Sequence, residues 1–210
     1  MAMSPRNNRS SDRTAKANII RRANLNGVYA VRRKISPASL SLMQSIEVKL
    51  LPELHNVGRL FDAHMLGVTV IGFSRFDKRH RGIGPSTASI SEKITSTKMP
   101  LEVVLGRLAV YGSELKAKLG IDIFSDELIN EELEYESCFS AADFPLKDDY
   151  NSNGSYKPHV SLALMYGDNF GYFKDKKLLA RLDSVAGLGA NCDKRITLEP
   201  VRPPEVQIYR

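Results

Sequence analysis

The same order of structural elements occurs twice along this chain of 210 residues, at about residues 27–73 and again at about 120–165. Each copy begins with a β-favouring run, continues with apolar residues at helical spacing, and ends in a second β-favouring run. The final run of each copy has a hydroxyl residue at its centre, Thr69 in the first and Ser161 in the second. This weak internal repeat predicts an α+β protein made of two similar lobes.

Local signals place the elements of the first copy. Residues 27–31 predict a strand that the basic residues 32–34 close. The pair Ser36-Pro37 suits the N-cap and first turn of a helix. Apolar residues then recur at helical spacing for about four turns, and Pro52 is expected to end or kink the helix.

The rest of the chain continues this alternation. The polar segment 74–98 is too long for an ordinary connection, which indicates a functional or a mobile loop. Residues 101–111 predict one long strand, or two short strands that meet at Gly106. The remaining predicted elements are a strand at 65–73, a strand at 120–124, a short acidic helix after Ser125, a strand from His159 to Leu164, a helix at 174–185 and extended chain at 195–209.

The net charge of +6 is concentrated at one end of the chain. Residues 1–24 contain six basic residues and one acidic residue, whereas the remainder has 24 basic and 23 acidic residues. We therefore expect 1–24 to be a basic tail with too little apolar content to fold, followed by a single bilobal domain at 25–210. The tail could contact RNA or another anion, or it could be a solvated leader without a partner.

Composition narrows the class of protein. The sequence has no run of eighteen apolar residues and no apolar signal segment near its start, so we expect no membrane association and a cytoplasmic location. Cys138 and Cys192 stand far apart, outside any Cys/His cluster. We expect free thiols, no metal site and no cofactor.

The segment with the clearest chemical content is 158–164, Pro-His-Val-Ser-Leu-Ala-Leu. His159 and Ser161 alternate with apolar residues, so strand geometry places the imidazole and the hydroxyl on one face. Such a pair offers acid/base chemistry and hydrogen bonding, as a phosphoryl or acyl transfer site requires. The alternative is a strand whose polar face merely meets solvent.

These features together resemble the 2H phosphoesterase superfamily, also called LigT-like or 2',5' RNA ligase-like proteins. The resemblance rests on segment 158–164, on the repeated order of elements, and on the strand blocks at 101–111 and 120–123. It spans roughly residues 26–208. It implies two pseudo-symmetric lobes around a central groove, each an antiparallel sheet with helices on its outer face and each contributing an HxT or HxS strand.

The first of the two motifs departs from the family pattern. Thr69 matches, but the residue two positions before it is Gly67 instead of histidine. His64 lies three residues earlier and is either a substitute base, which requires a fold-back or bulge, or a histidine at the strand entry. His80 lies in a basic cluster at 75–81, which is either a solvated loop or a phosphate-binding loop over the groove.

The resemblance implies metal-independent cleavage of a phosphodiester, on RNA ends with 2',3'-cyclic phosphate or 2'-5' linkages or on cyclic oligonucleotides. One histidine would take a proton from the nucleophile while the other protonates the leaving oxygen. The site residues that it implies are His159, Ser161, Thr69 and His64 for catalysis, and Tyr156, Arg75 and His80 for substrate binding.

Loss of one histidine leaves two other functions open. General acid–base catalysis by one group contributes about 10²- to 10⁴-fold in rate, so the site is expected to be slow unless another group replaces the histidine. The alternatives are a catalytically impaired module that binds a nucleotide or RNA, and a structural subunit of an RNA-containing assembly. What stands in place of the missing histidine distinguishes the enzyme from the module.

Overall fold

The computed structural model describes the central part of the chain in several segments. These are residues 30–55, 57–62, 65–72, 94, 99–112, 117–141, 156–165, 175–189 and 192–201. The basic tail predicted at 1–24 and the basic cluster at 75–81 fall outside them, so both stay predictions. None of the described helices is long and apolar enough to span a membrane.

Seven strands and three helices make up the described part of the chain. In order they are β1 (Ala30–Lys34), α2 (Pro37–Leu54), β2 (Gly58–Leu60), β3 (Gly67–Gly72), β4 (Leu101–Tyr111), β5 (Lys118–Phe124), α4 (Asp126–Ala141), β6 (His159–Met165), α6 (Lys176–Ala186) and β7 (Arg195–Leu198). The predicted repeat is present as β1, α2 and β3 and again as β5, α4 and β6, with the short β2 inserted in the first copy.

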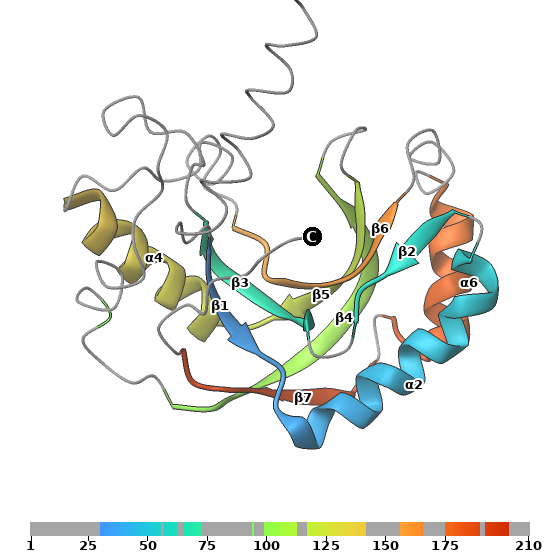
Figure 1. Ribbon diagram of the computed structural model, residues 1–210, viewed down its shortest axis with the longest axis horizontal. Coiled ribbons are helices and arrows are strands. Elements are labelled where there is room, and N and C mark those ends of the chain that lie inside the picture. The colour runs from blue at the N-terminus through green and yellow to red at the C-terminus, as the bar shows by residue number, and fades with distance from the viewer. Residues whose placement is uncertain are drawn as a thin grey trace, which may run out of the picture.

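The strands form one antiparallel sheet in the order β1-β3-β6-β5-β4-β7, and β2 pairs with β6. The two copies of the repeat are joined where β3 pairs with β6. At the far ends, Ile35 forms an isolated antiparallel bridge with Leu198, and the Glu199 amide donates to the Lys34 carbonyl at 2.8 Å. The sheet therefore curves back on itself into a cup (Figure 1).

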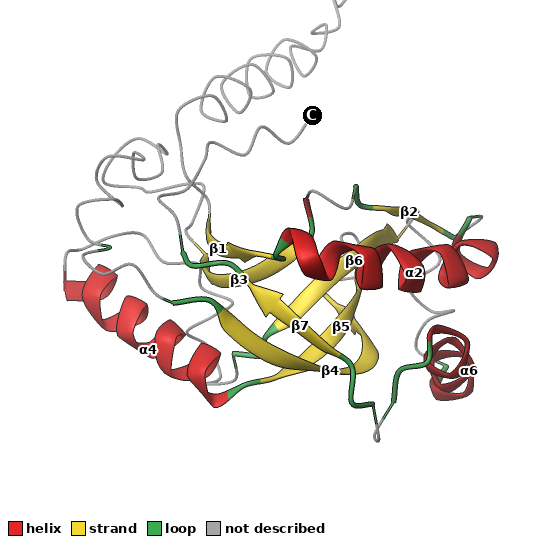
Figure 2. Cartoon of the chain, turned by 90° about the horizontal axis from the view of Figure 1, so that it is seen from below, coloured by secondary structure: helices red, strands yellow, loops and turns green. Residues whose placement is uncertain are grey.

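The helices lie on the outside of the curved sheet. Helix α4 lies beside β1 and β3, while α2 and α6 pack together on the other side (Figures 1 and 2). Each helix buries an apolar stripe because its large side chains recur every three or four residues. The fully buried helix residues are Met43, Ile46, Leu50 and Leu54 of α2, Leu128 and Phe139 of α4, and Leu182 and Ala186 of α6. The predicted α+β class, with antiparallel strands and outer helices, is confirmed.

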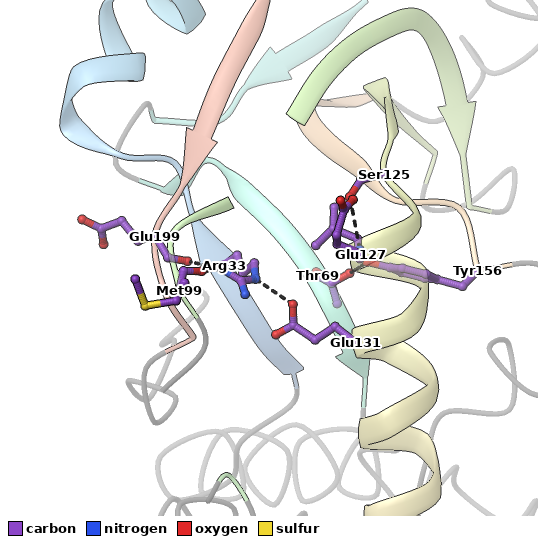
Figure 3. A network of polar contacts seen from close by, with 9 residues as sticks. Arg33, Thr69, Met99, Ser125, Glu127, Glu131, Tyr156 and Glu199 are labelled. Carbon is purple, nitrogen blue, oxygen red and sulfur yellow. Dashed lines mark hydrogen bonds and ion pairs between the residues drawn. The ribbon is translucent and has the colours of Figure 1, made fainter. Parts of the chain in front are cut away.

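A buried ion pair attaches α4 to the sheet. Arg33 Nε donates to Glu131 Oε2 at 2.8 Å, and the two side chains are only 4% and 5% exposed (Figure 3). Arg33 Nη1 also donates to the carbonyls of Met99 and Glu199, at 2.9 and 3.0 Å. One guanidinium therefore connects β1, α4, the start of β4 and the end of β7.

The structure corrects several predicted boundaries. Residues 32–34 continue the first strand instead of closing it, because Arg32 and Arg33 point to opposite faces and each finds polar partners. Pro52 lies in the last turn of α2 without ending it. The acidic helix is not short but runs for 16 residues. Strand β2 was not predicted, since three residues carry too little periodicity to detect.

Candidate active site

The pairing of β3 with β6 brings the two hydroxyl-bearing strands together. Val68 lies opposite Val160 in this antiparallel pair. Continuing the register by one residue in each direction places Thr69 beside His159 and Gly67 beside Ser161. An antiparallel pair also has a local two-fold axis, which here makes Thr69 equivalent to Ser161 and Gly67 equivalent to His159.

These residues lie on the inner face of the sheet. Arg33 is opposite Val68 in the β1–β3 pair, and its side chain binds Glu131 on the outer helix α4. Val68 and Val160 share that outer face and are completely buried. Because side chains alternate along a strand, Thr69 and His159 project from the face opposite to α4. Helix α4 lies outside the curved sheet (Figure 1), so this face is the inner one. Both are half-buried.

Cross-strand partners extend this pair into a row. Arg32 of β1 is opposite Thr69, and Asp122 of β5 is opposite His159. Four strands thus contribute one polar side chain each, in the order Arg32, Thr69, His159 and Asp122. In the next row Ser161 lies opposite Gly120 of β5. The site is therefore a row of polar side chains across four adjacent strands.

The hydrogen bond made by His159 determines its tautomer. Its Nδ1 lies 2.9 Å from the Lys157 carbonyl oxygen. A carbonyl only accepts hydrogen bonds, so we assign the proton of the neutral ring to Nδ1. The other nitrogen, Nε2, then has its lone pair available to accept a proton. His159 is thus set up as a general base.

Burial lowers the pKa of His159 below its ordinary value. The positive charges of Lys118 and Arg32 act in the same direction, whereas the Lys157 carbonyl and the Asp122 carboxylate oppose them. The net effect favours the neutral ring near pH 7. This agrees with the base role that the tautomer indicates.

Tyr111, at the end of β4, packs directly against the base. Its ring is stacked on the imidazole of His159, with centroids 3.6 Å apart and planes inclined by 9°. Its hydroxyl donates to Asp122 Oδ1, and burial together with this bond raises the pKa of Tyr111. The ring lies over Gly120, where an added Cβ would come within 3.1 Å of Tyr111 Cε2. Gly120 therefore leaves the space in which Tyr111 reaches His159.

Sequence reasoning missed Tyr111, Asp122 and Arg32. Tyr111 ends a strand, Asp122 alternates with apolar residues and Arg32 lies in a basic run, and all three patterns are common in strands. Only the register between strands places them beside His159. The alternation of Asp122 with Ile121 and Ile123 is the one sequence signal that could have placed it on a polar face.

Tyr156, a predicted substrate contact, lies at the same place. Its hydroxyl donates to the Thr69 carbonyl at 2.8 Å (Figure 3). This bond ties the segment before β6 to β3. The side chain is half-buried, and its role in binding a substrate stays a prediction.

Of the seven predicted site residues, the structure brings together His159, Ser161, Thr69 and Tyr156. The other three, His64, Arg75 and His80, lie outside the described residues, and their roles stay predictions. The described residues contain no group of three or more His, Cys, Asp or Glu side chains that could hold a metal ion.

Gly67 lies where the backbones of β1 and β3 approach closely. A Cβ added to it would be 2.5 Å from the Arg33 carbonyl oxygen and 3.3 Å from Lys34 Cα. A side chain at this position would therefore require the backbone to move. Beside it, Arg32 Nη2 donates to the carbonyls of Met65 and Gly67, at 3.0 and 3.3 Å.

No protein-family model matches the sequence, and no curated protein does. Solved structures with a similar chain path include TT0787 of Thermus thermophilus, at 11% identity and a TM-score of 0.45, covering 66% of this chain and 74% of that one. Usb1 of Kluyveromyces marxianus is similar at 15% identity and a TM-score of 0.38, covering 79% of this chain and 88% of that one. The site described above rests on the geometry of this chain alone.

Proposed function

We propose that the protein is a metal-independent phosphodiesterase of the 2H type. Its substrates would be RNA ends with 2',3'-cyclic phosphate or 2'-5' linkages, or cyclic oligonucleotides. The observation that supports this most directly is the pairing of β3 with β6, which sets a histidine base beside a threonine and near a serine on one face. The segment 158–164 and the element order, both shared with the 2H superfamily, support the same chemistry.

In the proposed reaction a water oxygen attacks phosphorus while His159 Nε2 takes the water proton. The hydroxyls of Thr69 and Ser161 donate to the non-bridging oxygens as negative charge builds on them. The bond to the leaving oxygen breaks, its electron pair stays on that oxygen, and a proton neutralises it. That proton comes from His64 or His80, or from solvent, and the His159 imidazolium later releases its own proton to water.

The glycine at position 67 limits the expected rate of this reaction, because it cannot transfer a proton. It occupies the position equivalent to His159, so no imidazole stands where the family pattern has its first histidine. The missing proton transfer is worth about 10²- to 10⁴-fold unless His64 or His80 supplies it. We therefore expect slow turnover compared with a site that has both histidines.

A phosphate-binding module without turnover is the second candidate. The observation that favours it is the close approach of the Arg33 carbonyl to Gly67, which leaves no room for a side chain at that position. Such a module would keep Thr69, Ser161 and His159 as hydrogen-bonding groups for a nucleotide or RNA phosphate.

A cleavage screen separates the two candidates. The substrates are RNA with a 2',3'-cyclic phosphate end, 2'-5' oligoadenylate, and cyclic di- and trinucleotides, each incubated in the presence of EDTA. We expect the wild type to cleave at least one of them, and His159→Ala to lose about 10²-fold or more. His55→Ala is the matched control, because His55 Nδ1 also contacts a carbonyl, that of Pro52 at 2.7 Å, but lies exposed at the end of α2.

Turnover that survives in His159→Ala contradicts the proposed enzyme. Binding of these ligands without turnover, weakened in Ser161→Ala or Thr69→Ala, favours the module. A complete loss of cleavage in the presence of EDTA, restored by a divalent cation, contradicts the metal-independent mechanism.

A further inference from the structure

We propose that Arg32 and Lys118 bind the phosphate of the substrate from the two sides of His159. This inference rests on the proposed function, because it concerns the same site. It assigns a binding role to two residues whose sequence patterns give no sign of one. The probe that tests it, inorganic phosphate, requires no turnover.

Arg32 approaches the site from β1. It is opposite Thr69, which in turn lies beside His159, so all three residues project from the inner face. The neighbouring arginine shows the contrast, because Arg33 points outward and pairs with Glu131 under α4. One arginine of the pair is therefore used to hold the fold together, while the other faces the base.

The guanidinium of Arg32 is held in place by main-chain carbonyls. Its Nη2 donates to Met65 O at 3.0 Å and Gly67 O at 3.3 Å. These carbonyls orient the guanidinium, and an arginine keeps its charge at all physiological pH values. Because Gly67 is equivalent to His159, Arg32 places a permanent cation next to the position where the first histidine of the family pattern is missing.

Lys118 approaches from the other side. It is the first residue of β5, two residues before Gly120, and it lies opposite Tyr111, whose ring is stacked on His159. Burial is the main cause of the lowered pKa of His159, and the charges of the Lys118 ammonium and the Arg32 guanidinium both lower it further. The same two positive charges attract an anion that lies between them, in front of Thr69 and Ser161.

The two cations should contribute unequally. Arg32 is half-buried and fixed by two hydrogen bonds, so its charge is less screened by solvent. Lys118 is exposed, so its contribution should be smaller and more sensitive to salt. Arg32 is therefore the residue on which binding should depend most.

The test follows the His159 ring by NMR while inorganic phosphate is added to the full chain. His159→Ala identifies the signal among the four histidines. The variants are Arg32→Met, Arg32→Lys and Lys118→Met. Arg181→Met is the matched control, because Arg181 is an exposed arginine of the outer helix α6, where its Nη2 donates to Glu53 Oε2 at 2.6 Å.

We expect phosphate to raise the pKa of His159 in the wild type, because an anion favours the imidazolium. Arg32→Met should weaken phosphate binding by about 10- to 100-fold, the range for one charge-assisted contact. Lys118→Met should weaken it less, and Arg181→Met should leave it unchanged. Without phosphate, the pKa of His159 should rise in Arg32→Met, because a neighbouring cation has been removed.

Wild-type phosphate affinity in Arg32→Met, or an equal loss in Arg181→Met, overturns the inference. If Arg32→Met does not fold, Arg32→Lys decides: a folded Arg32→Lys with wild-type or slightly weaker affinity supports it, and loss of all phosphate binding despite the retained charge overturns it. Arg32-dependent phosphate binding in a protein that cleaves none of the screened substrates means that this inference holds while the proposed enzyme fails.

Discussion

At the scale of single residues, the environment of His159 decides what it can do. A carbonyl fixes its Nδ1 proton, and burial under the Tyr111 ring keeps the imidazole neutral. A neutral histidine with a free Nε2 acts as a base. Thr69 and Ser161 supply hydrogen-bond donors on the same face.

Tyr111 is a positioning residue whose removal should change the titration of His159. In Tyr111→Ala the imidazole becomes exposed, so its pKa should rise toward the ordinary value of about 6.5. The base is active only when neutral, so the acid limb of kcat/KM should move to higher pH. Tyr111→Phe keeps the stacked ring but loses the bond to Asp122, and should shift the limb less. An NMR titration that finds the same His159 pKa in all three proteins contradicts this role.

Gly67 should not tolerate even the smallest side chain. The Cβ of Gly67→Ala would lie 2.5 Å from the Arg33 carbonyl oxygen, which forces β1 or β3 to shift. We expect a loss of about 1–3 kcal/mol in the free energy of unfolding, as for other overpacked sites, measured by denaturant titration. Gly67→His, which restores the family pattern on paper, should lose at least as much. Wild-type stability in Gly67→Ala shows that the strands can separate here without cost.

At the scale of elements, α2 contains a buried carboxyl group. Glu47 is 8% exposed, and its Oε1 has no hydrogen-bond partner in the described structure. Burial, assisted by the negative charge of Asp62, raises the pKa of Glu47 to about 7. At a pH between about 4.5 and 7, Glu47 therefore holds a proton in the folded protein that it has already released in the unfolded chain, where its pKa is near the ordinary 4.5.

This difference should make stability depend on pH in a defined window. Between about 4.5 and 7 the folded state binds more protons than the unfolded state, so the stabilisation linked to Glu47 is complete below this window and is lost as pH rises through it. Glu47→Gln cannot titrate, and the gap in unfolding free energy between Glu47→Gln and wild type should widen in favour of the variant from pH 5 to pH 8. A constant gap across this range contradicts the raised pKa.

At the scale of the whole molecule, the curved sheet is held together by contacts between distant segments. The bridge between Ile35 and Leu198 joins its two ends, and the pairing of β3 with β6 joins the two copies of the repeat. Arg33 connects four parts of the chain through Glu131, Met99 and Glu199 (Figure 3).

The Arg33–Glu131 pair should therefore be far more important for stability than an exposed ion pair. Glu131→Gln leaves a buried guanidinium without its counter-charge, for which we expect a loss of about 3–5 kcal/mol in unfolding free energy. Glu102→Gln removes the partner of Arg195 in a pair of equal length, 2.8 Å, whose side chains are 59% and 61% exposed. That control should lose at most about 1 kcal/mol. Equal losses in the two variants contradict the role of Arg33 as the connecting residue.

Sequence by itself determined most of the elements of this protein and their order, because helical and strand periodicity are local properties of the chain. It also placed His159 and Ser161 on one strand face, since alternation along a strand needs no distant partner. It could not detect β2, or show that Arg32–Lys34 continue a strand, because those residues form strands only through their partners.

Only the tertiary structure decided what surrounds the base. Thr69 lies 90 positions before His159, and it is the register of β3 against β6 that sets them side by side. The register of β5 against β6 likewise places Asp122 opposite His159. The long side chain of Tyr111 reaches across Gly120 to stack on the His159 ring. The cation beside Gly67 is Arg32 for the same reason, because β1 pairs with β3. Pairing between strands depends on the whole sheet and its covering helices, so no local pattern in the sequence contains it.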